Sequence, residues 1–170
     1  MNIIGPDLLI FGVDDVEACK QFALDYGLTQ TSEHRFVALD GTGIEIYSKD
    51  DSSLPAPLET GSNIRKTIYG VADTATVDAI YDELSKDREV KRLDDGSIEA
   101  VDDMGFVLGF QVTMRKPLDM PAEKINAPGA PAQRPANEVG VSKAFTPEPR
   151  TLSHVVYFVP VFKKAEAFYA

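Results

Sequence analysis

The amino-acid sequence predicts an α+β protein made of paired βαβββ modules. Strand-length apolar runs alternate with two amphipathic helical stretches, and the order strand, helix, strands occurs twice before residue 116. Short turns that contain glycine separate the later strands of each unit. Because one such unit exposes an apolar face of its sheet, we expect the two units to pair and bury it.

The first unit occupies residues 8–47. An apolar run of strand length is followed by Asp14 and Asp15, which suit the start of a helix, and apolar residues then recur at helical spacing until Gly27 ends the helix. Two short apolar runs flank a turn that contains glycine. The predicted elements are a strand at 8–13, a helix at 16–26, and strands at 36–39 and 44–47.

The second unit occupies residues 66–112 and follows a polar loop at 49–62. Asp73 or Thr74 is expected to cap its helix, and three strands come after it. The predicted elements are a strand at 66–71, a helix at 75–86, and strands at 89–93, 98–101 and 106–112. The apolar faces of the two units predict the buried side chains Phe11, Phe22, Ile46, Tyr69, Ile80, Leu84 and Phe110.

The composition argues against several classes of function. The 170 residues include 17 basic and 27 acidic side chains, a formal net charge of −10. Since no basic stripe is present to neutralise phosphates, we expect no nucleic-acid binding, and an anionic membrane surface is disfavoured for the same reason. No apolar run is long enough to span a membrane, and the first residues show no signal-peptide pattern. Because a single cysteine allows no intrachain disulfide, we expect a cytoplasmic protein.

Several polar residues have structural interpretations. The single cysteine, Cys19, lies on the apolar stripe of the first helix and is interpreted as a small buried hydrophobic residue. His34 lies between two charged residues and is expected at a solvated strand edge rather than in a metal site. The acidic pairs at 50–51, 94–95 and 102–103 lie in turns, where short carboxylates bond their own backbone, and we assign them no chemistry.

The composition changes between residues 116 and 150. Seven of the eleven prolines fall there, with alanines and glycines between them, and no helical or alternating period survives. We interpret residues 1–115 as an N-terminal domain and residues 116–150 as a linker or an ordered surface crossing. The periodic signal then returns, with a predicted strand at 152–159 and a predicted helix at 162–169.

The end of the sequence repeats its beginning. At a constant offset of 146 residues and without gaps, His154 aligns with Leu8 and Phe168 aligns with Phe22. Residues 151–170 are therefore predicted to be the first strand and helix of a second module. Because the helix shows no stop signal before residue 170, we expect a truncated protein whose second domain is incomplete here.

Three segments carry a family pattern. They are Asp-Leu-Leu-Ile-Phe-Gly-Val-Asp-Asp at 7–15, followed by Phe22, Tyr26 and Gly27-Leu28; Val-Asp-Asp-Met-Gly-Phe-Val-Leu-Gly-Phe at 101–110; and Pro-Glu-Pro-Arg-Thr-Leu-Ser-His-Val-Val at 147–156. The first two resemble the opening and closing elements of a module of the vicinal-oxygen-chelate superfamily. The third is similar to the junction into the second domain of type I extradiol ring-cleavage dioxygenases. The resemblance implies the fold of the glyoxalases and extradiol dioxygenases.

The resemblance also implies where metal ligands fall. Modules of this family that bind metal use a histidine in the first strand, a second histidine in the first strand of the second half, and a glutamate in the last strand. In the first module these positions hold Leu8, Lys66 and Gly109, which implies a metal-free domain. In the second module His154 falls on the first ligand position, and its partners would lie beyond residue 170. Val161 stands where an acidic residue is usual, so the match is weaker there.

By this resemblance the complete protein is expected to be an Fe(II)- or Mn(II)-dependent extradiol dioxygenase, which cleaves a catechol-like aromatic with dioxygen in aromatic catabolism. We expect a homo-oligomer. We expect no ring cleavage by residues 1–170 alone, because the metal needs three protein ligands and one is present. Two alternatives stay open: a glyoxalase- or epimerase-like enzyme whose metal stabilises an enolate, and a metal-free binding protein of the bleomycin-resistance kind.

Overall fold

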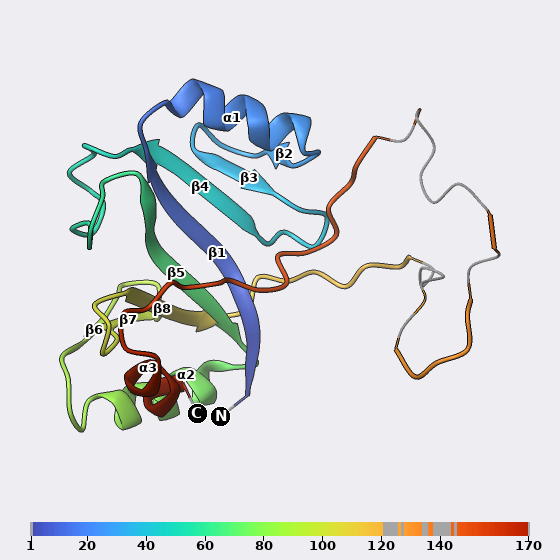
Figure 1. The fold of residues 1–170 in the computed structure, drawn as a ribbon. Coiled ribbons are helices and arrows are strands. Elements are labelled where there is room, and N and C mark those ends of the chain that lie inside the picture. The colour runs from blue at the N-terminus through green and yellow to red at the C-terminus, as the bar shows by residue number, and fades with distance from the viewer. Residues whose placement is uncertain are drawn as a thin grey trace.

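The computed structural model describes residues 2–120, 126, 128–133, 136–137, 144 and 146–169. Eight strands form one mixed sheet in the order β2-β3-β4-β1-β5-β8-β7-β6. Its two central strands are β1 and β5, and each is followed in the chain by a helix and three strands (Figure 1). The predicted α+β class and the paired βαβββ architecture are therefore confirmed.

The two halves have the same order of elements. The first half comprises β1 (Ile3–Val13), α1 (Val16–Asp25), β2 (Thr29–Gln30), β3 (Arg35–Val37) and β4 (Gly43–Ser48). The second half comprises β5 (Asn63–Val71), α2 (Thr74–Leu84), β6 (Val90–Arg92), β7 (Ile98–Val101) and β8 (Val107–Val112), and α3 (Phe162–Tyr169) follows the proline-rich region. In each half the last strand pairs in parallel with the first, and antiparallel pairing of β1 with β5 joins the halves.

An aspartate caps the N-terminus of each of the helices α1 and α2. The carboxylate of Asp15 accepts a hydrogen bond from the backbone N–H of Ala18 at 2.9 Å, and that of Asp73 accepts one from Thr76 at 2.8 Å. Gly27 follows α1 with a φ of +96°, a left-handed conformation that favours glycine. The predicted start signals of both helices and the predicted glycine stop of α1 are confirmed, whereas α2 ends at Leu84 and not at the predicted Lys86.

Each half buries its own cluster of apolar side chains between helix and sheet. The first cluster consists of Val13, Ala23, Phe36 and Ile46, and the second of Val71, Val77, Ile80, Ile98, Leu108 and Phe110. Among the side chains predicted to be buried, Ile46, Ile80 and Phe110 belong to these clusters, and Phe11, Tyr69 and Leu84 are partly buried against them. Cys19 is also partly buried against the first cluster.

The prediction was wrong for Phe22, whose side chain is 69% exposed. The adjacent Ala23 is only 1% exposed and faces the sheet, and its small side chain lets α1 lie close to the strands. Since only one stripe of a helix can face a sheet, Phe22 points sideways and stacks on Tyr26 with 6.2 Å between the ring centroids.

Residues 149–160, the crossing segment, run across the sheet between its two halves and lead into α3 (Figure 1). The predicted helix at 162–169 is present, but the predicted strand at 152–159 is not formed. A strand exists only where a neighbour exchanges backbone hydrogen bonds with it, and no described strand pairs with this segment. Within the described part of the chain, no helix is both long and apolar enough to cross a membrane.

Candidate functional site

The three metal-ligand positions implied by the resemblance lie together in the first module. Leu8 of β1 and Gly109 of β8 are both register partners of Ile68 in β5. A Cβ atom on Gly109 would lie 3.4 Å from Cε of Lys66. Neither Leu8, which is buried, nor Gly109 has a donor atom in its side chain, so only Lys66 contributes a polar group.

Lys66 pairs its ammonium group with the carboxylate of Glu99 in β7. An ammonium group has three donors and no lone pair, so it cannot coordinate a cation. These positions therefore do not fit Fe(II) or Mn(II). Among the residues that the structure describes, no group of three or more His, Cys, Asp or Glu side chains is placed to hold a metal ion.

A small cavity of about 140 Å³ borders this ion pair and is lined partly by Ile10 of β1 and by residues 53–55 of the loop after β4. Arg65 holds that loop in place, because its guanidinium donates hydrogen bonds to the carbonyl oxygens of Pro55 at 2.8 Å and of Gly61 at 3.1 Å. The loop thus closes over a site whose charges are already paired.

His34 lies just before β3 and is half-buried. Its ring stacks on Tyr47 with 4.3 Å between centroids, and Nδ1 lies 3.0 Å from the carbonyl oxygen of Ile46. The structure thus gives His34 packing and hydrogen-bonding contacts. The acidic turn residues also act locally, because Asp51 and Asp95 each accept a hydrogen bond from a backbone N–H two residues later.

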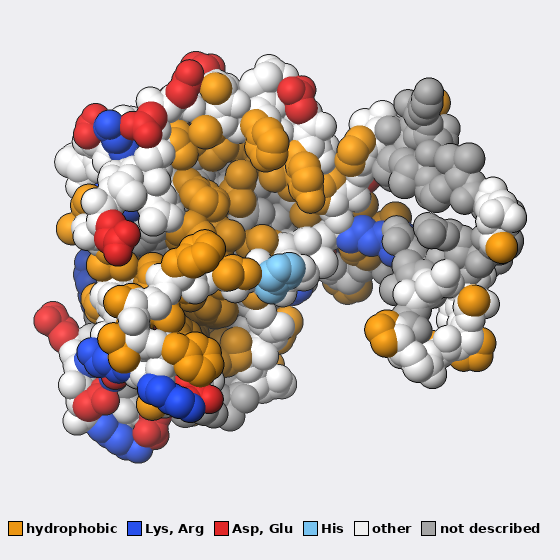
Figure 2. Space-filling model, in the orientation of Figure 1, with side chains coloured by type: hydrophobic (Ala, Val, Ile, Leu, Met, Phe, Trp, Pro, Cys, Tyr) orange, Lys and Arg blue, Asp and Glu red, His pale blue; other side chains and the backbone are white. Residues whose placement is uncertain are grey.

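His154 lies on the exposed side of the crossing segment, with Nδ1 2.9 Å from the hydroxyl oxygen of Ser153. Tyr157 turns toward the sheet, whereas Val156 and Phe158 are 67% and 94% exposed. Figure 2 shows hydrophobic side chains gathered over the middle of this face. The side chains of residues 154–159 thus alternate between exposed and partly buried, as they do in a strand. The metal role of His154 stays a prediction.

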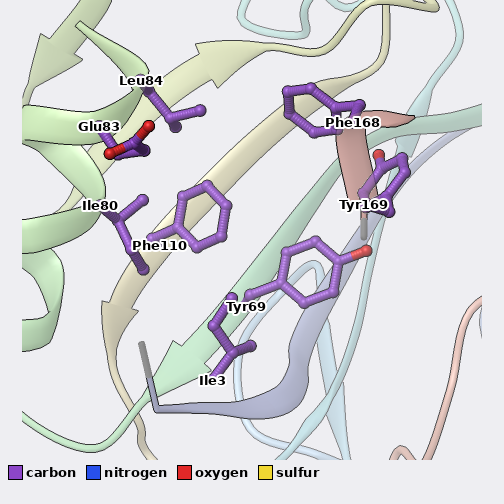
Figure 3. Close-up of a pocket in the computed structure, with 8 residues that line it drawn as sticks. All are labelled: Ile3, Tyr69, Ile80, Glu83, Leu84, Phe110, Phe168 and Tyr169. Carbon is purple, nitrogen blue, oxygen red and sulfur yellow. The ribbon is translucent and has the colours of Figure 1, made fainter. Parts of the chain in front are cut away.

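A larger cavity of about 340 Å³ lies between α2, α3 and the sheet (Figure 3). Its lining is aliphatic and aromatic apart from one carboxylate and two phenol groups, and it consists of Ile3, Tyr69, Ile80, Glu83, Leu84, Phe110, Phe168 and Tyr169. The rings of Tyr69 and Phe110 stack with 5.7 Å between centroids. The sequence did not predict this cavity, because α3 closes it from the far end of the chain.

Two phenol groups of the crossing segment and α3 are held in apolar surroundings. Tyr157 donates a hydrogen bond to the hydroxyl of Thr67, and Tyr169 donates one to the carboxylate of Asp102 at 2.7 Å. Burial raises the pKa of both phenol groups well above their ordinary value of 10.0, and the hydrogen bond to Asp102 raises the pKa of Tyr169 further.

These raised pKa values predict a loss of stability in alkali. Below a pH of about 10 both states keep the Tyr157 proton, whereas above it the unfolded chain releases that proton and the native state retains it. The free energy of unfolding should then fall by at most about 1.4 kcal/mol per pH unit for this group. Urea unfolding between about pH 8 and pH 11 measures the slope, and Tyr157→Phe should flatten it; an unchanged slope would contradict the prediction.

Solved structures of similar fold include two enzymes. The chain is similar to catechol 2,3-dioxygenase, with a TM-score of 0.52 and 13% identity over 66% of this chain and 40% of that one. It is similar to the Mn(II)-bound glyoxalase from Novosphingobium aromaticivorans, with a TM-score of 0.52 and 15% identity over 71% of this chain and 43% of that one. The chain has the vicinal-oxygen-chelate fold. At these identities the likeness establishes the fold alone.

Sequence comparison gives no relative from which an activity could be transferred. No protein-family model and no curated protein sequence matches the chain. The chain spans about two fifths of the length of the two similar structures. The activity of the protein is therefore a matter for proposal.

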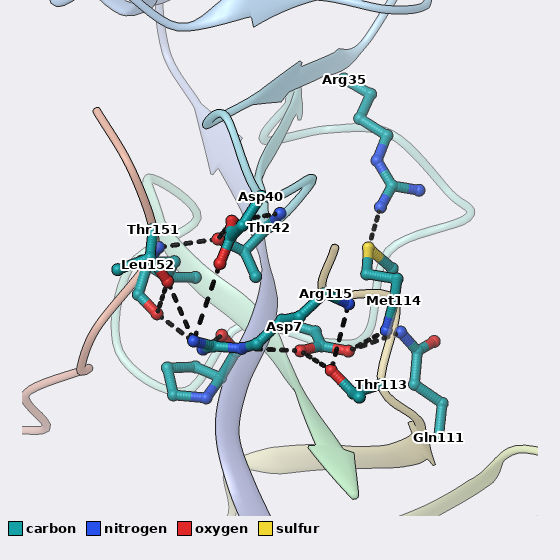
Figure 4. Close-up of polar contacts among 11 residues, drawn as sticks. Asp7, Arg35, Asp40, Thr42, Gln111, Thr113, Met114, Arg115, Thr151 and Leu152 are labelled. Atoms are coloured by element: carbon teal, nitrogen blue, oxygen red, sulfur yellow. Dashed lines mark hydrogen bonds and ion pairs between the residues drawn. The ribbon is translucent and has the colours of Figure 1, made fainter. Parts of the chain in front are cut away.

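Sequence reasoning missed the residues that hold the crossing segment in place. These are Asp7, Asp40, Thr42 and Arg115 (Figure 4). Asp7 and Arg115 are 108 positions apart, and no periodic pattern links residues at that separation. The sequence offers one signal for these residues: Asp7 directly precedes an apolar run, where a carboxylate needs hydrogen-bond partners if it is buried.

Proposed function

We propose that this chain is the metal-free first module of a two-module extradiol dioxygenase, joined to the opening residues of the module that binds metal. The substrate would be a catechol-like aromatic, cleaved with dioxygen at Fe(II) or Mn(II). The described residues do not form a site for the metal, and no chemical step is assigned to them. Their role is to support the second module and to supply His154.

The backbone of residues 153–159 is the observation that best supports this proposal. Its N–H and C=O groups have no backbone partner in the described ranges, although the side chains of residues 154–159 alternate between exposed and partly buried, as in a strand. At the offset of 146 residues this segment aligns with β1, which is paired on both sides by β4 and β5. Unpaired strand backbone is expected to gain neighbours. His154 would then take the position that Leu8 has in β1.

Metal content and oxygen uptake test the proposal. The 170-residue chain should consume no oxygen with catechols after loading with Fe(II) or Mn(II), because it offers one of three ligands. A polypeptide extended to complete the second module should bind stoichiometric metal and consume oxygen. Ring cleavage by the 170-residue chain would contradict the proposal, as would an extended polypeptide that binds metal and leaves catechols intact.

The glyoxalase-like alternative is favoured by one observation, the equal TM-score of 0.52 against the Mn(II)-bound glyoxalase. An enzyme of that kind would isomerise or cleave its substrate at the metal without taking up oxygen. The same assay separates the two candidates, since only the dioxygenase consumes oxygen. An extended polypeptide that binds no metal would favour a binding protein.

A further inference from the structure

Asp7 of β1 is a fully buried carboxylate, with 0% of its surface exposed. Its oxygens accept hydrogen bonds from the hydroxyl of Thr113 at 3.0 Å, the backbone N–H of Met114 at 2.9 Å and the amide of Gln111 at 3.2 Å. Nε of Arg115 lies 3.4 Å from Oδ1 and supplies the compensating charge. A buried carboxylate with this many partners is held in one place.

The same guanidinium reaches the crossing segment from the other side. Nη2 of Arg115 donates to the carbonyl oxygens of Pro6 and Leu152, both at 2.8 Å, and Nη1 donates to the hydroxyl of Thr151 at 2.9 Å (Figure 4). Because the guanidinium is planar and forked, one side chain can hold β1 and the crossing segment at fixed positions.

The turn between β3 and β4 holds the other edge of the crossing segment. The N–H of Leu152 donates to the hydroxyl of Thr42 at 2.7 Å, and that hydroxyl donates to the buried carboxylate of Asp40 at 2.6 Å. The N–H of Leu39 donates to the carbonyl oxygen of Pro149 at 2.9 Å. Residues 149–152 are therefore fixed on both sides, and Arg115 also lies 3.8 Å from Asp40.

The contacts change directly after Leu152. Residues 153–159 make no backbone hydrogen bond to any described residue, and Tyr157 contacts the sheet through its hydroxyl, which donates to Thr67. His154 is two residues beyond Leu152, a distance of about 7 Å in extended chain. The position at which Leu152 is held therefore limits where His154 can lie.

We infer that Arg115 is the positioning residue for the entry of the chain into the second module. It acts through the backbone of Leu152 and touches no reacting group. Arg115, Asp7, Asp40 and Thr42, here called the Arg115 cluster, fix the start of the segment that contains His154. This inference rests on the proposed function for the identification of that segment with the first strand of the second module, but the attachment itself is present in the 170-residue chain.

Amide hydrogen exchange in the metal-free 170-residue chain tests the inference. Arg115→Lys keeps a positive charge beside Asp7, but one ammonium group cannot reach Pro6, Thr151 and Leu152 together. The amides of Leu39 and Leu152 should then exchange about tenfold faster or more, while those of β1 and β5 keep their rates. The near-ultraviolet circular dichroism of the Tyr157–Phe106 stack, with centroids 4.4 Å apart, should weaken.

Two further variants make the test decisive. Thr42→Val removes the acceptor of the Leu152 N–H and leaves the Asp7–Arg115 pair intact, so it should give the same local pattern even if Arg115→Lys fails to fold. Arg92→Lys is the matched control, because Arg92 pairs with Asp78 and lies over the ring of Tyr81, both in α2. It should change nothing in the crossing segment.

The outcomes separate this inference from the proposed function. Unchanged exchange at Leu152 in both Arg115→Lys and Thr42→Val would overturn the inference, and so would acceleration spread evenly over the whole sheet. Neither result depends on metal or oxygen. Conversely, an extended polypeptide without dioxygenase activity would end the proposed function and leave the exchange pattern of the Arg115 cluster as measured.

Discussion

Gly70→Ala is expected to lower the free energy of unfolding by about 3 kcal/mol or more. The Cβ atom added in β5 would lie 2.4 Å from Oδ1 and 2.5 Å from Oδ2 of Asp7, closer than any real contact. The carboxylate would have to move, and it would then lose the donors from Thr113, Met114 and Gln111 while staying buried. Urea unfolding of the 170-residue chain measures the loss.

Gly96→Ala is the matched control for this substitution. Gly96 has a φ of +84°, and a Cβ atom there would meet nothing within 4 Å. Its replacement should therefore cost only the strain of a left-handed alanine, about 1 kcal/mol. If Gly70→Ala costs no more than Gly96→Ala, the Asp7 carboxylate is free to move, and the rigid attachment ascribed to it does not exist.

Local patterns predicted most of the fold. Acidic residues at the helix starts and helical periodicity identified α1 and α2, and a glycine stop identified the end of α1. Short apolar runs between turns identified the strands of both halves except β2. The largest error in a predicted boundary is at the start of β1, which begins at Ile3 and not at Leu8. Gly5 and Pro6 are strand breakers by composition, but β1 accommodates them with shifts of register against β5. The two-residue strand β2 is too short for any periodic signal.

Long-range contacts limited the prediction of the site. The lack of donor side chains at Leu8 and Gly109 follows from residue type alone, and the fold brings these positions together. The Asp7–Arg115 pair depends on where β8 ends relative to β1, which sheet topology decides. The segment at 152–159 has the side-chain pattern of a strand, but the pattern cannot supply the neighbouring strand that it needs.

His154→Ala is expected to abolish metal binding and turnover together in the extended, two-module polypeptide. The change leaves two of three protein ligands, and since changes outside the ligands of a metal site already cost 10–100-fold, turnover should fall by about 100-fold or more. The fold should survive, because His154 is exposed and its hydrogen bond is with the neighbouring Ser153. The free energy of unfolding should change by less than about 1 kcal/mol.

His34→Ala is the matched control, since His34 is the other of the two histidines in the sequence. The His34→Ala protein loses the stack on Tyr47 and the contact with the Ile46 carbonyl oxygen, so its free energy of unfolding should fall by about 1–2 kcal/mol. Metal content, measured by elemental analysis, should stay at the wild-type level. The two variants thus predict opposite patterns, metal loss without destabilisation and destabilisation without metal loss. A His154→Ala protein with stoichiometric metal and wild-type turnover would refute the role proposed for His154.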